Sequence, residues 1–143
     1  MSDKTYLTAT HDQGKALVMR AISGELVMLN LLRFREVADY SAAPQLAPPE
    51  PITGEQAYRR YMELAEPFVR AGGGSLLFMG RGGPFLIGPH DERWDAALVV
   101  RQRSVADFIA FAQNPEYLAV LGHRQAALED SRLLPLSEWK VGG

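Results

Sequence analysis

Residues 25–34 read ELVMLNLLRF, and this run decides the fold. Side chains alternate between the two faces of a β-strand, and both faces of this run are apolar. One face carries Leu26, Met28, Asn30 and Leu32, and the other carries Val27, Leu29 and Leu31. A helix is the competing interpretation, but the run is short and follows a glycine. We therefore predict a strand over Glu25–Phe34 that is covered on both sides.

The rest of the chain supplies helices and strands on either side of this run. Thr53 and Gln56 form a capping-box pattern that starts a helix ending near Ala71, with Pro67 bending its last turn. Asn114-Pro115 is a further helix start, after a helix that begins beyond Ser104. The other predicted elements are a helix over Gln13–Ile22, a proline-rich loop over 36–51, and strands over Ser75–Met79, Phe85–Ile87, Trp94–Gln102 and Arg132–Leu136.

The predicted order is a short helix followed by β-α-β-β-α-β. This order is typical of the ferredoxin-like arrangement, an α+β fold in which one antiparallel sheet carries helices on one face. We expect a single domain over 1–143, with residues 1–24 as an N-terminal helical extension. Helices on one face leave the other apolar face of the sheet uncovered, so the sequence predicts a homodimer that pairs two sheets as an α/β barrel.

Composition excludes several classes of function. The 143 residues carry a net charge of −2, which offers no basic surface for nucleic acid. There is no cysteine, so disulfides and thiolate metal sites are excluded, and a reducing cytoplasm is the expected location. The chain shows neither a signal-peptide pattern nor an apolar run long enough to span a membrane. The scattered histidines give no metal-binding pattern, so no metal or cofactor is expected.

Two short polar stretches hold the candidate site, at Gly88–Asp95 and from His123-Arg124 to Arg132. Both combine charged side chains with His or Trp, which an ordinary surface turn rarely does, so we interpret them as the rim of a pocket. His123 is the best acid–base candidate because histidine titrates near neutral pH. Arg124 beside it could stabilise negative charge. The competing interpretation is structural: a packed histidine, and an arginine paired with Glu129 or Asp130.

Six further residues are predicted to face a ligand. Asn30 is a polar group in an apolar strand, and the competing interpretation is a buried amide satisfied by a neighbour. Trp94 could seal the pocket edge, and Asp95 should pair with an arginine because an unpaired carboxylate is costly there. The remaining members are Tyr58, Tyr61 and Arg132; the two tyrosines could equally be core residues.

Four segments resemble a known bacterial family. Met28–Arg35 resembles the opening strand of a domain-of-unknown-function family in the dimeric α/β-barrel superfamily. Gly88–Asp95 is similar to its second signature, with His90 where an acidic residue is usual. Asn114–Tyr117 and His123–Arg132 resemble the third and fourth. The likeness spans roughly Leu26 to Leu134, and the wider superfamily includes cofactor-free monooxygenases, lactone isomerases and haem-binding enzymes.

Two functions remain open from the sequence. The first is a homodimer that binds a small molecule between sheet and helices, with the resemblance implying cofactor-independent chemistry on a small aromatic or lactone-like compound. The second is a non-catalytic ligand-binding or accessory protein, in which the signature residues serve packing and dimer assembly. Fold alone does not decide between them.

Overall fold

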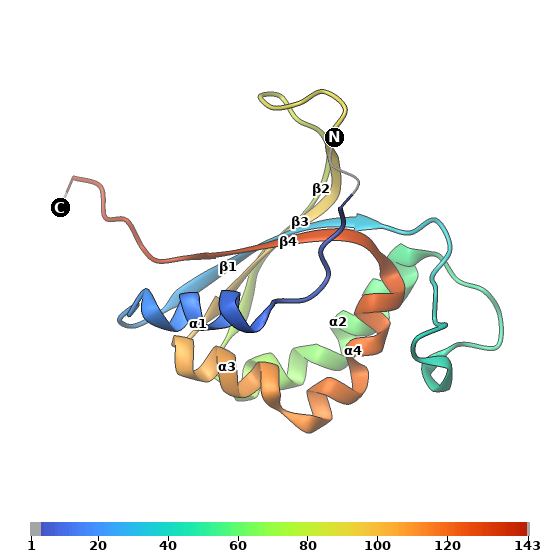
Figure 1. Cartoon of the computed structure of the whole chain (residues 1–143), viewed down its shortest axis with the longest axis horizontal. Coiled ribbons are helices and arrows are strands. Elements are labelled where there is room, and N and C mark those ends of the chain that lie inside the picture. Colours follow the sequence, from blue (N-terminus) through green and yellow to red (C-terminus); the bar gives the residue numbers. More distant parts are fainter. Residues whose placement is uncertain (1–3, 143) are drawn as a thin grey trace.

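The computed structural model describes residues 4–142 and contains one four-stranded sheet with helices packed beneath it (Figure 1). The strands are β1 (Leu26–Phe34), β2 (Ser75–Pro84), β3 (Arg93–Gln102) and β4 (Leu128–Leu136). The helices are α1 (His11–Met19), α2 (Gly54–Ala71), α3 (Val105–Gln113) and α4 (Pro115–Ala127), with a short 3-10 turn η1 (Pro44–Leu46) in the proline-rich loop.

The strand order is β2-β3-β1-β4, and every neighbouring pair is antiparallel. Strand β1 lies between β3 and β4. Helix α2 connects β1 to β2, and α3 with α4 connects β3 to β4. The protein therefore has the ferredoxin-like α+β fold that the element order predicts.

Local capping explains where the helices begin. Thr53 and Gln56 form the reciprocal capping box at the start of α2, and Asn114 caps α4 by accepting from the Glu116 N–H at 2.9 Å. Pro67 lies inside α2, which continues to Ala71. The Gly54 N–H donates to the Arg35 carbonyl at 3.0 Å, so the first turn of α2 lies against the end of β1.

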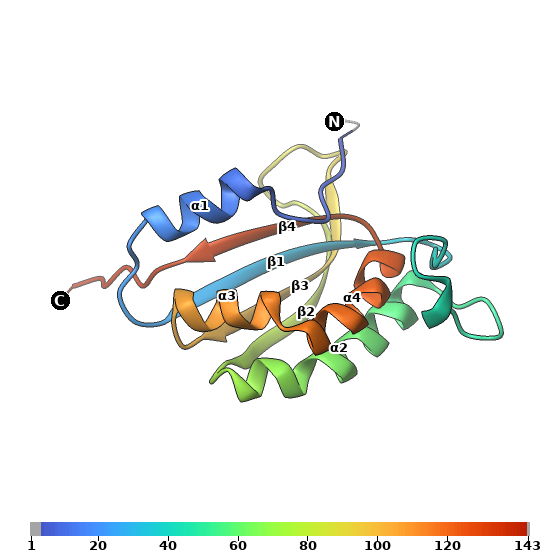
Figure 2. The same cartoon turned by 60° about the horizontal axis from the view of Figure 1, so that its bottom comes forward.

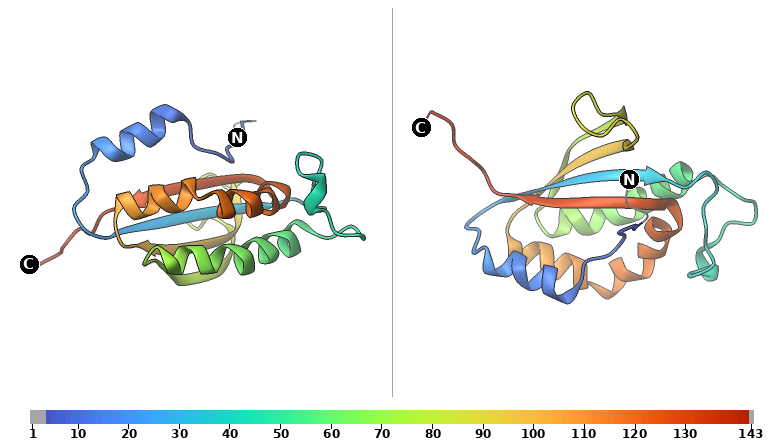
Figure 3. Two further views of the ribbon diagram at one scale, coloured as in Figure 1. Left: turned by 90° about the horizontal axis from the view of Figure 1, so that it is seen from below. Right: turned by 45° about the horizontal axis from the view of Figure 1, so that its top comes forward.

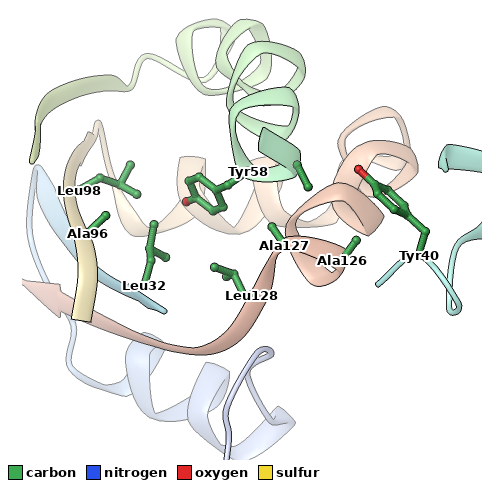
Figure 4. Packing of buried hydrophobic residues seen from close by; sticks show 9 residues of the cluster. Leu32, Tyr40, Tyr58, Ala96, Leu98, Ala126, Ala127 and Leu128 are labelled. Carbon is green, nitrogen blue, oxygen red and sulfur yellow. The ribbon is translucent and has the colours of Figure 1, made fainter. Parts of the chain in front are cut away.

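Helices α2, α3 and α4 all cover the same face of the sheet, the one to which Leu26, Met28, Asn30 and Leu32 point. The core lies between α2, α4 and this face, where Tyr58 extends from α2 toward the sheet above Leu32 (Figure 4). Alanines at 57, 126 and 127 let α2 and α4 approach one another closely. The core thus occupies one end of the layer between sheet and helices.

No helix of the described residues covers the opposite face of the sheet (Figure 1). This face carries apolar side chains. In the single chain Phe78 is 64% exposed and Leu134 is 53% exposed. The half-buried residues Leu29, Leu31 and Val99 lie on the same face, between these two strands. We call this set, Leu29, Leu31, Phe78, Val99 and Leu134, the open face.

Two predicted strand boundaries are wrong. Strand β2 runs unbroken through the glycine segment to Pro84, with a register shift between Leu76 and Phe78, so Phe85–Ile87 is not a strand. These residues belong to the connection to β3, where Leu86 is fully exposed. Strand β4 begins at Leu128 and not at Arg132, so Glu129 and Asp130 lie in the strand and not before it.

Helix α1 stands apart from the other helices, along the β4 edge of the sheet (Figures 2 and 3). All nine of its residues are described, and none of them is buried. The segment Tyr6–Leu7, which we call the strap, precedes α1 and binds to β4. The Ser131 N–H donates to the Tyr6 carbonyl at 3.1 Å. Arg20 Nη1 donates to the Pro135 carbonyl at 2.7 Å on the other side of α1. The predicted N-terminal helix is present from His11 to Met19, and residues 1–3 of the predicted extension lie outside the described residues.

Candidate functional site

A cavity of about 1180 Å³ lies between the sheet and the helices. Its floor is the covered face of the sheet, and its walls come from α2, α3, α4 and α1. Most of the wall is apolar, with Met62, Ala65 and Val69 from α2, Phe108, Phe111 and Ala112 from α3, Leu121 from α4 and Ala16 and Leu17 from α1. The volume slightly exceeds the roughly 300–1,000 Å³ of pockets that commonly hold small organic molecules, so a molecule of that size fits.

Polar side chains gather at the end of the cavity nearest the core. Arg124 Nη1 donates to the Leu7 carbonyl at 2.7 Å, and its Nη2 donates to the Ser131 hydroxyl at 3.3 Å. The Tyr61 and Tyr117 hydroxyl oxygens are 2.6 Å apart, so one phenol donates to the other. Tyr58 lies beside both groups, and its ring contacts that of Tyr61 at 5.3 Å between centroids. We call Tyr58, Tyr61, Tyr117 and Arg124 the polar cluster.

The three phenols of the polar cluster stay protonated at neutral pH. Burial raises the pKa of Tyr58 to about 12, although the charge of Arg124 opposes the rise. Burial also raises the pKa of Tyr61 well above its ordinary value, and the Tyr117 phenol beside it adds to the rise. The pKa of Tyr117 is raised as well, mainly by burial. The cluster therefore offers hydrogen-bond donors and one fixed positive charge.

Asn30 lies on the cavity floor and is held only loosely by the protein. Its Nδ2 has the Met28 carbonyl at 3.4 Å and the Leu98 carbonyl at 3.5 Å, both at the long limit for a hydrogen bond. A buried amide normally has closer partners, so a ligand with a carbonyl or hydroxyl group could improve on them. The structure thus places Asn30, Tyr58, Tyr61 and Arg124 of the predicted site on one cavity, with Arg132 on its rim.

His123 does not line this cavity; it faces the loop that follows β1. Its Nδ1 is 2.7 Å from the Tyr40 hydroxyl, and the residue is 5% exposed. Burial lowers the pKa of His123, and the positive charge of Arg60 lowers it further. This position supports the structural interpretation of His123, in which a neutral imidazole accepts the Tyr40 hydroxyl hydrogen.

The lowered pKa of His123 predicts an acid-labile fold. A group whose pKa is lower in the folded state contributes stability above its unfolded pKa and loses it as the pH falls through the folded value. We expect the melting temperature to drop on acidification from pH 7 to pH 5, and His123→Phe to flatten that drop. The matched control is His90→Phe in the exposed β2–β3 loop, which should leave the drop unchanged. Equal pH dependence in wild type and His123→Phe would show that His123 does not couple its protonation to folding.

Trp94 lines a second, smaller cavity of about 150 Å³, together with Arg33, Asp130 and Arg132. The guanidinium carbon of Arg33 lies 4.5 Å from the centre of the Trp94 ring, and the guanidinium carbon of Arg132 lies 5.0 Å from the same centre. Asp130, which is 3% exposed, accepts from Arg132 at 2.7 Å and from the Tyr6 N–H at 2.8 Å. Burial raises the pKa of Asp130, but these bonds and that from the Ser131 N–H lower it more, and the net shift is downward.

Asp95 has a local structural contact and lines neither cavity. Its Oδ2 accepts from the Phe34 N–H at 2.8 Å, and its Oδ1 is 3.5 Å from Arg93, so Asp95 has an arginine neighbour as predicted. The Trp94 Nε1–H donates to Glu92 at 3.1 Å. The segment around Gly88–Asp95 is therefore organised by its own side chains and by the end of β1.

Sequence reasoning missed several groups of the site. Tyr117 stands seven residues before Arg124, two helical turns along one face of α4, and that spacing could have paired it with the cavity. Ser131 was missed because the last strand was predicted to begin at Arg132. Tyr6 and Leu7 gave no signal, since only the tertiary structure brings this strap to Arg124. Among residues 4–142, no three His, Asp or Glu side chains come together as a possible metal site.

The chain matches known families and structures over most of its length. Residues 50–135 match the family model described as domain of unknown function DUF1330. The crystal structure of the methylated RPA0582 protein is 34% identical, with a TM-score of 0.82 over 97% of this chain and 98% of that one. A second structure of RPA0582, described as a protein of unknown function from Rhodopseudomonas palustris, is also 34% identical, with a TM-score of 0.80 over 96% and 100% of the two chains.

A more distant structure, a dimeric ferredoxin-like protein of unknown function from Thermobifida fusca, is 15% identical and has a TM-score of 0.48 over 81% of this chain and 92% of that one. None of the curated proteins matches the chain. Within residues 4–142, no helix has the length and apolar character that crossing a membrane requires. Because the family model covers more than half of the sequence, the chain belongs to the DUF1330 family.

Proposed function

We propose that the protein binds a small, largely apolar organic molecule in the cavity between sheet and helices. The observation that carries this proposal is the cavity of about 1180 Å³, whose apolar walls converge on the polar cluster at one end. Ligand sites commonly have this construction, in which apolar walls supply affinity and a few polar groups fix orientation. No cofactor is part of the proposal.

We also propose that the binding unit is a homodimer with one cavity per subunit. The open face is apolar and lies on the side of the sheet away from the cavity, so two copies can cover it without closing either binding site. An apolar sheet face of this kind is costly to leave in water. A two-fold pairing of identical faces covers it with a single interface.

The geometry favours binding over acid–base catalysis. The phenols that line the cavity stay protonated at neutral pH, and a general base needs a group that accepts a proton there. Glu66 is the only carboxylate on the described lining, and it is paired with Arg70 at 3.3 Å. His123 faces Tyr40. An enzymatic version of the proposal would have Arg124 and the phenols to stabilise negative charge on an aromatic or lactone-like substrate, but no free general base among the described lining residues.

A blocking variant tests the binding proposal. Val69 lines the cavity from α2, and Val69→Trp should fill part of it. A neutral probe such as naphthylethanol should raise the melting temperature of the wild type by several degrees at a concentration well above its dissociation constant. The same probe should have little effect on Val69→Trp.

The matched control is Leu64→Trp, because Leu64 is 44% exposed on α2 and does not line the cavity. This variant should respond to the probe as the wild type does. The proposal fails if the wild type shows no shift with any apolar probe, or if Val69→Trp binds as tightly as the control.

A further inference from the structure

The charges on the cavity wall are unbalanced. Four arginines line the cavity, Arg20, Arg70, Arg124 and Arg132, against the single carboxylate of Glu66 in the described part of the chain. Glu66 pairs with Arg70, and Arg132 pairs with Asp130 at 2.7 Å. Arg20 is exposed at the rim. This leaves Arg124 as the cation inside the cavity that needs a counter-charge.

Arg124 is oriented by neutral groups only. It donates to the Leu7 carbonyl and the Ser131 hydroxyl and lies against the Tyr58 phenol, and among residues 4–142 it forms no ion pair with a carboxylate. A carbonyl and a hydroxyl hold the guanidinium in place without neutralising it. In the low dielectric of a half-buried site, a positive charge without a counter-ion is costly, and an anion that reaches it is held strongly.

The neighbours of Arg124 favour an acceptor of hydrogen bonds. The Tyr58 phenol is protonated, as is the Tyr61–Tyr117 pair, which has one hydroxyl hydrogen left after its internal bond at 2.6 Å. A guanidinium and phenolic hydrogens on one side of a cavity suit a planar carboxylate. One cation matches a single negative charge, whereas a phosphate dianion would require at least a second cation.

We infer that the natural ligand is an amphipathic monocarboxylic acid, with its carboxylate on Arg124 and the polar cluster and its apolar body along Val69, Phe108 and Phe111. This inference rests on the proposed function and specifies its ligand class. Arg124 is then the residue that selects acids over neutral molecules of the same shape. The apolar walls contribute to the binding of both.

Three probes with one apolar body separate the inference from the proposed function. They are naphthylacetate, its methyl ester and naphthylethanol, of which only the first carries a charge. Calorimetric titration of the full chain should show naphthylacetate binding roughly tenfold or more tighter than either neutral probe, as expected for hydrogen bonds to a charged group. Arg124→Gln should abolish this preference, and Arg124→Lys should retain part of it.

The control is Arg59→Gln, which removes an exposed cation of α2 that pairs with Glu55 and does not line the cavity. It should keep the preference for the acid. Equal binding of all three probes by the wild type would overturn the inference and leave the proposed function standing. Binding of none of them would overturn both. If Arg124→Gln fails to fold, the inference stands or falls on the acid-to-ester ratio in the wild type and in Arg124→Lys.

Discussion

Replacing Leu31 with lysine is expected to convert the proposed homodimer to folded monomers. Leu31 lies at the centre of the open face, paired with Ala97 on β3 and Arg132 on β4. In a two-fold interface both copies carry the change, and each would bury an ammonium group without a partner. A loss of about 4 kcal/mol, roughly a thousandfold in the dissociation constant, is the order of effect expected.

Light scattering or sedimentation at micromolar concentration measures this change. The matched control is Leu118→Lys, because Leu118 is 48% exposed on α4, away from the sheet. That variant should remain dimeric. A wild-type protein that is monomeric at the same concentration would refute the dimer, and a Leu31→Lys dimer would move the interface elsewhere.

Gly54→Ala is expected to destabilise the fold severely. A Cβ at this position would come within 2.3 Å of the Arg35 carbonyl oxygen and 2.5 Å of the Ala127 carbonyl oxygen. Both are backbone atoms that cannot rotate aside, so α2 would have to shift away from the end of β1 and the start of β4. The same shift would disturb Ala57 and Tyr58 in the core. We expect a loss of about 3 kcal/mol or more, measured by urea denaturation.

Gly14→Ala in α1 is the comparison for this loss, since nothing lies within 4 Å of the added methyl group there. It makes the same chemical change in open space and in a helix, where alanine is the better residue. Its stability should equal or slightly exceed that of the wild type. A Gly54→Ala protein as stable as Gly14→Ala would mean that the first turn of α2 is less tightly packed than described.

The architecture was accessible from the sequence because each level of the pattern agreed. The doubly apolar run at 25–34, the caps at Thr53 and Asn114, and the order of elements all point to one fold. The wrong strand boundaries lie where the local residue types indicate a turn but the backbone pairs with a neighbouring strand. The glycines and Pro84 in β2 are typical of a turn, yet Gly83 pairs with Trp94 and Pro84 pairs with Arg93. Both strands therefore extend to this point. Asp130 and Ser131 are polar residues typical of a turn, yet they are part of β4. Hydrogen bonds with Tyr6 and Arg132 satisfy their polar groups there.

The site was predictable residue by residue but not as an arrangement. Tyr58, Tyr61 and Arg124 carry visible chemistry, and the structure brings them together. His123 carries the same kind of signal, but the helix turns it toward Tyr40. One position along a helix changes the direction of a side chain by about 100°, so neighbours such as His123 and Arg124 meet different surroundings. Only the packing of α4 decides which of them reaches the cavity.

The loosely attached helix α1 has an evolutionary consequence. It supplies one wall of the cavity through Ala16 and Leu17, although none of its nine residues is buried. Substitutions at exposed positions usually change stability by only a few tenths of a kcal/mol. The helix also lies outside residues 50–135, which match the family model. Family members can therefore diverge in the molecules they admit by varying this wall, while the core that maintains the fold stays unchanged.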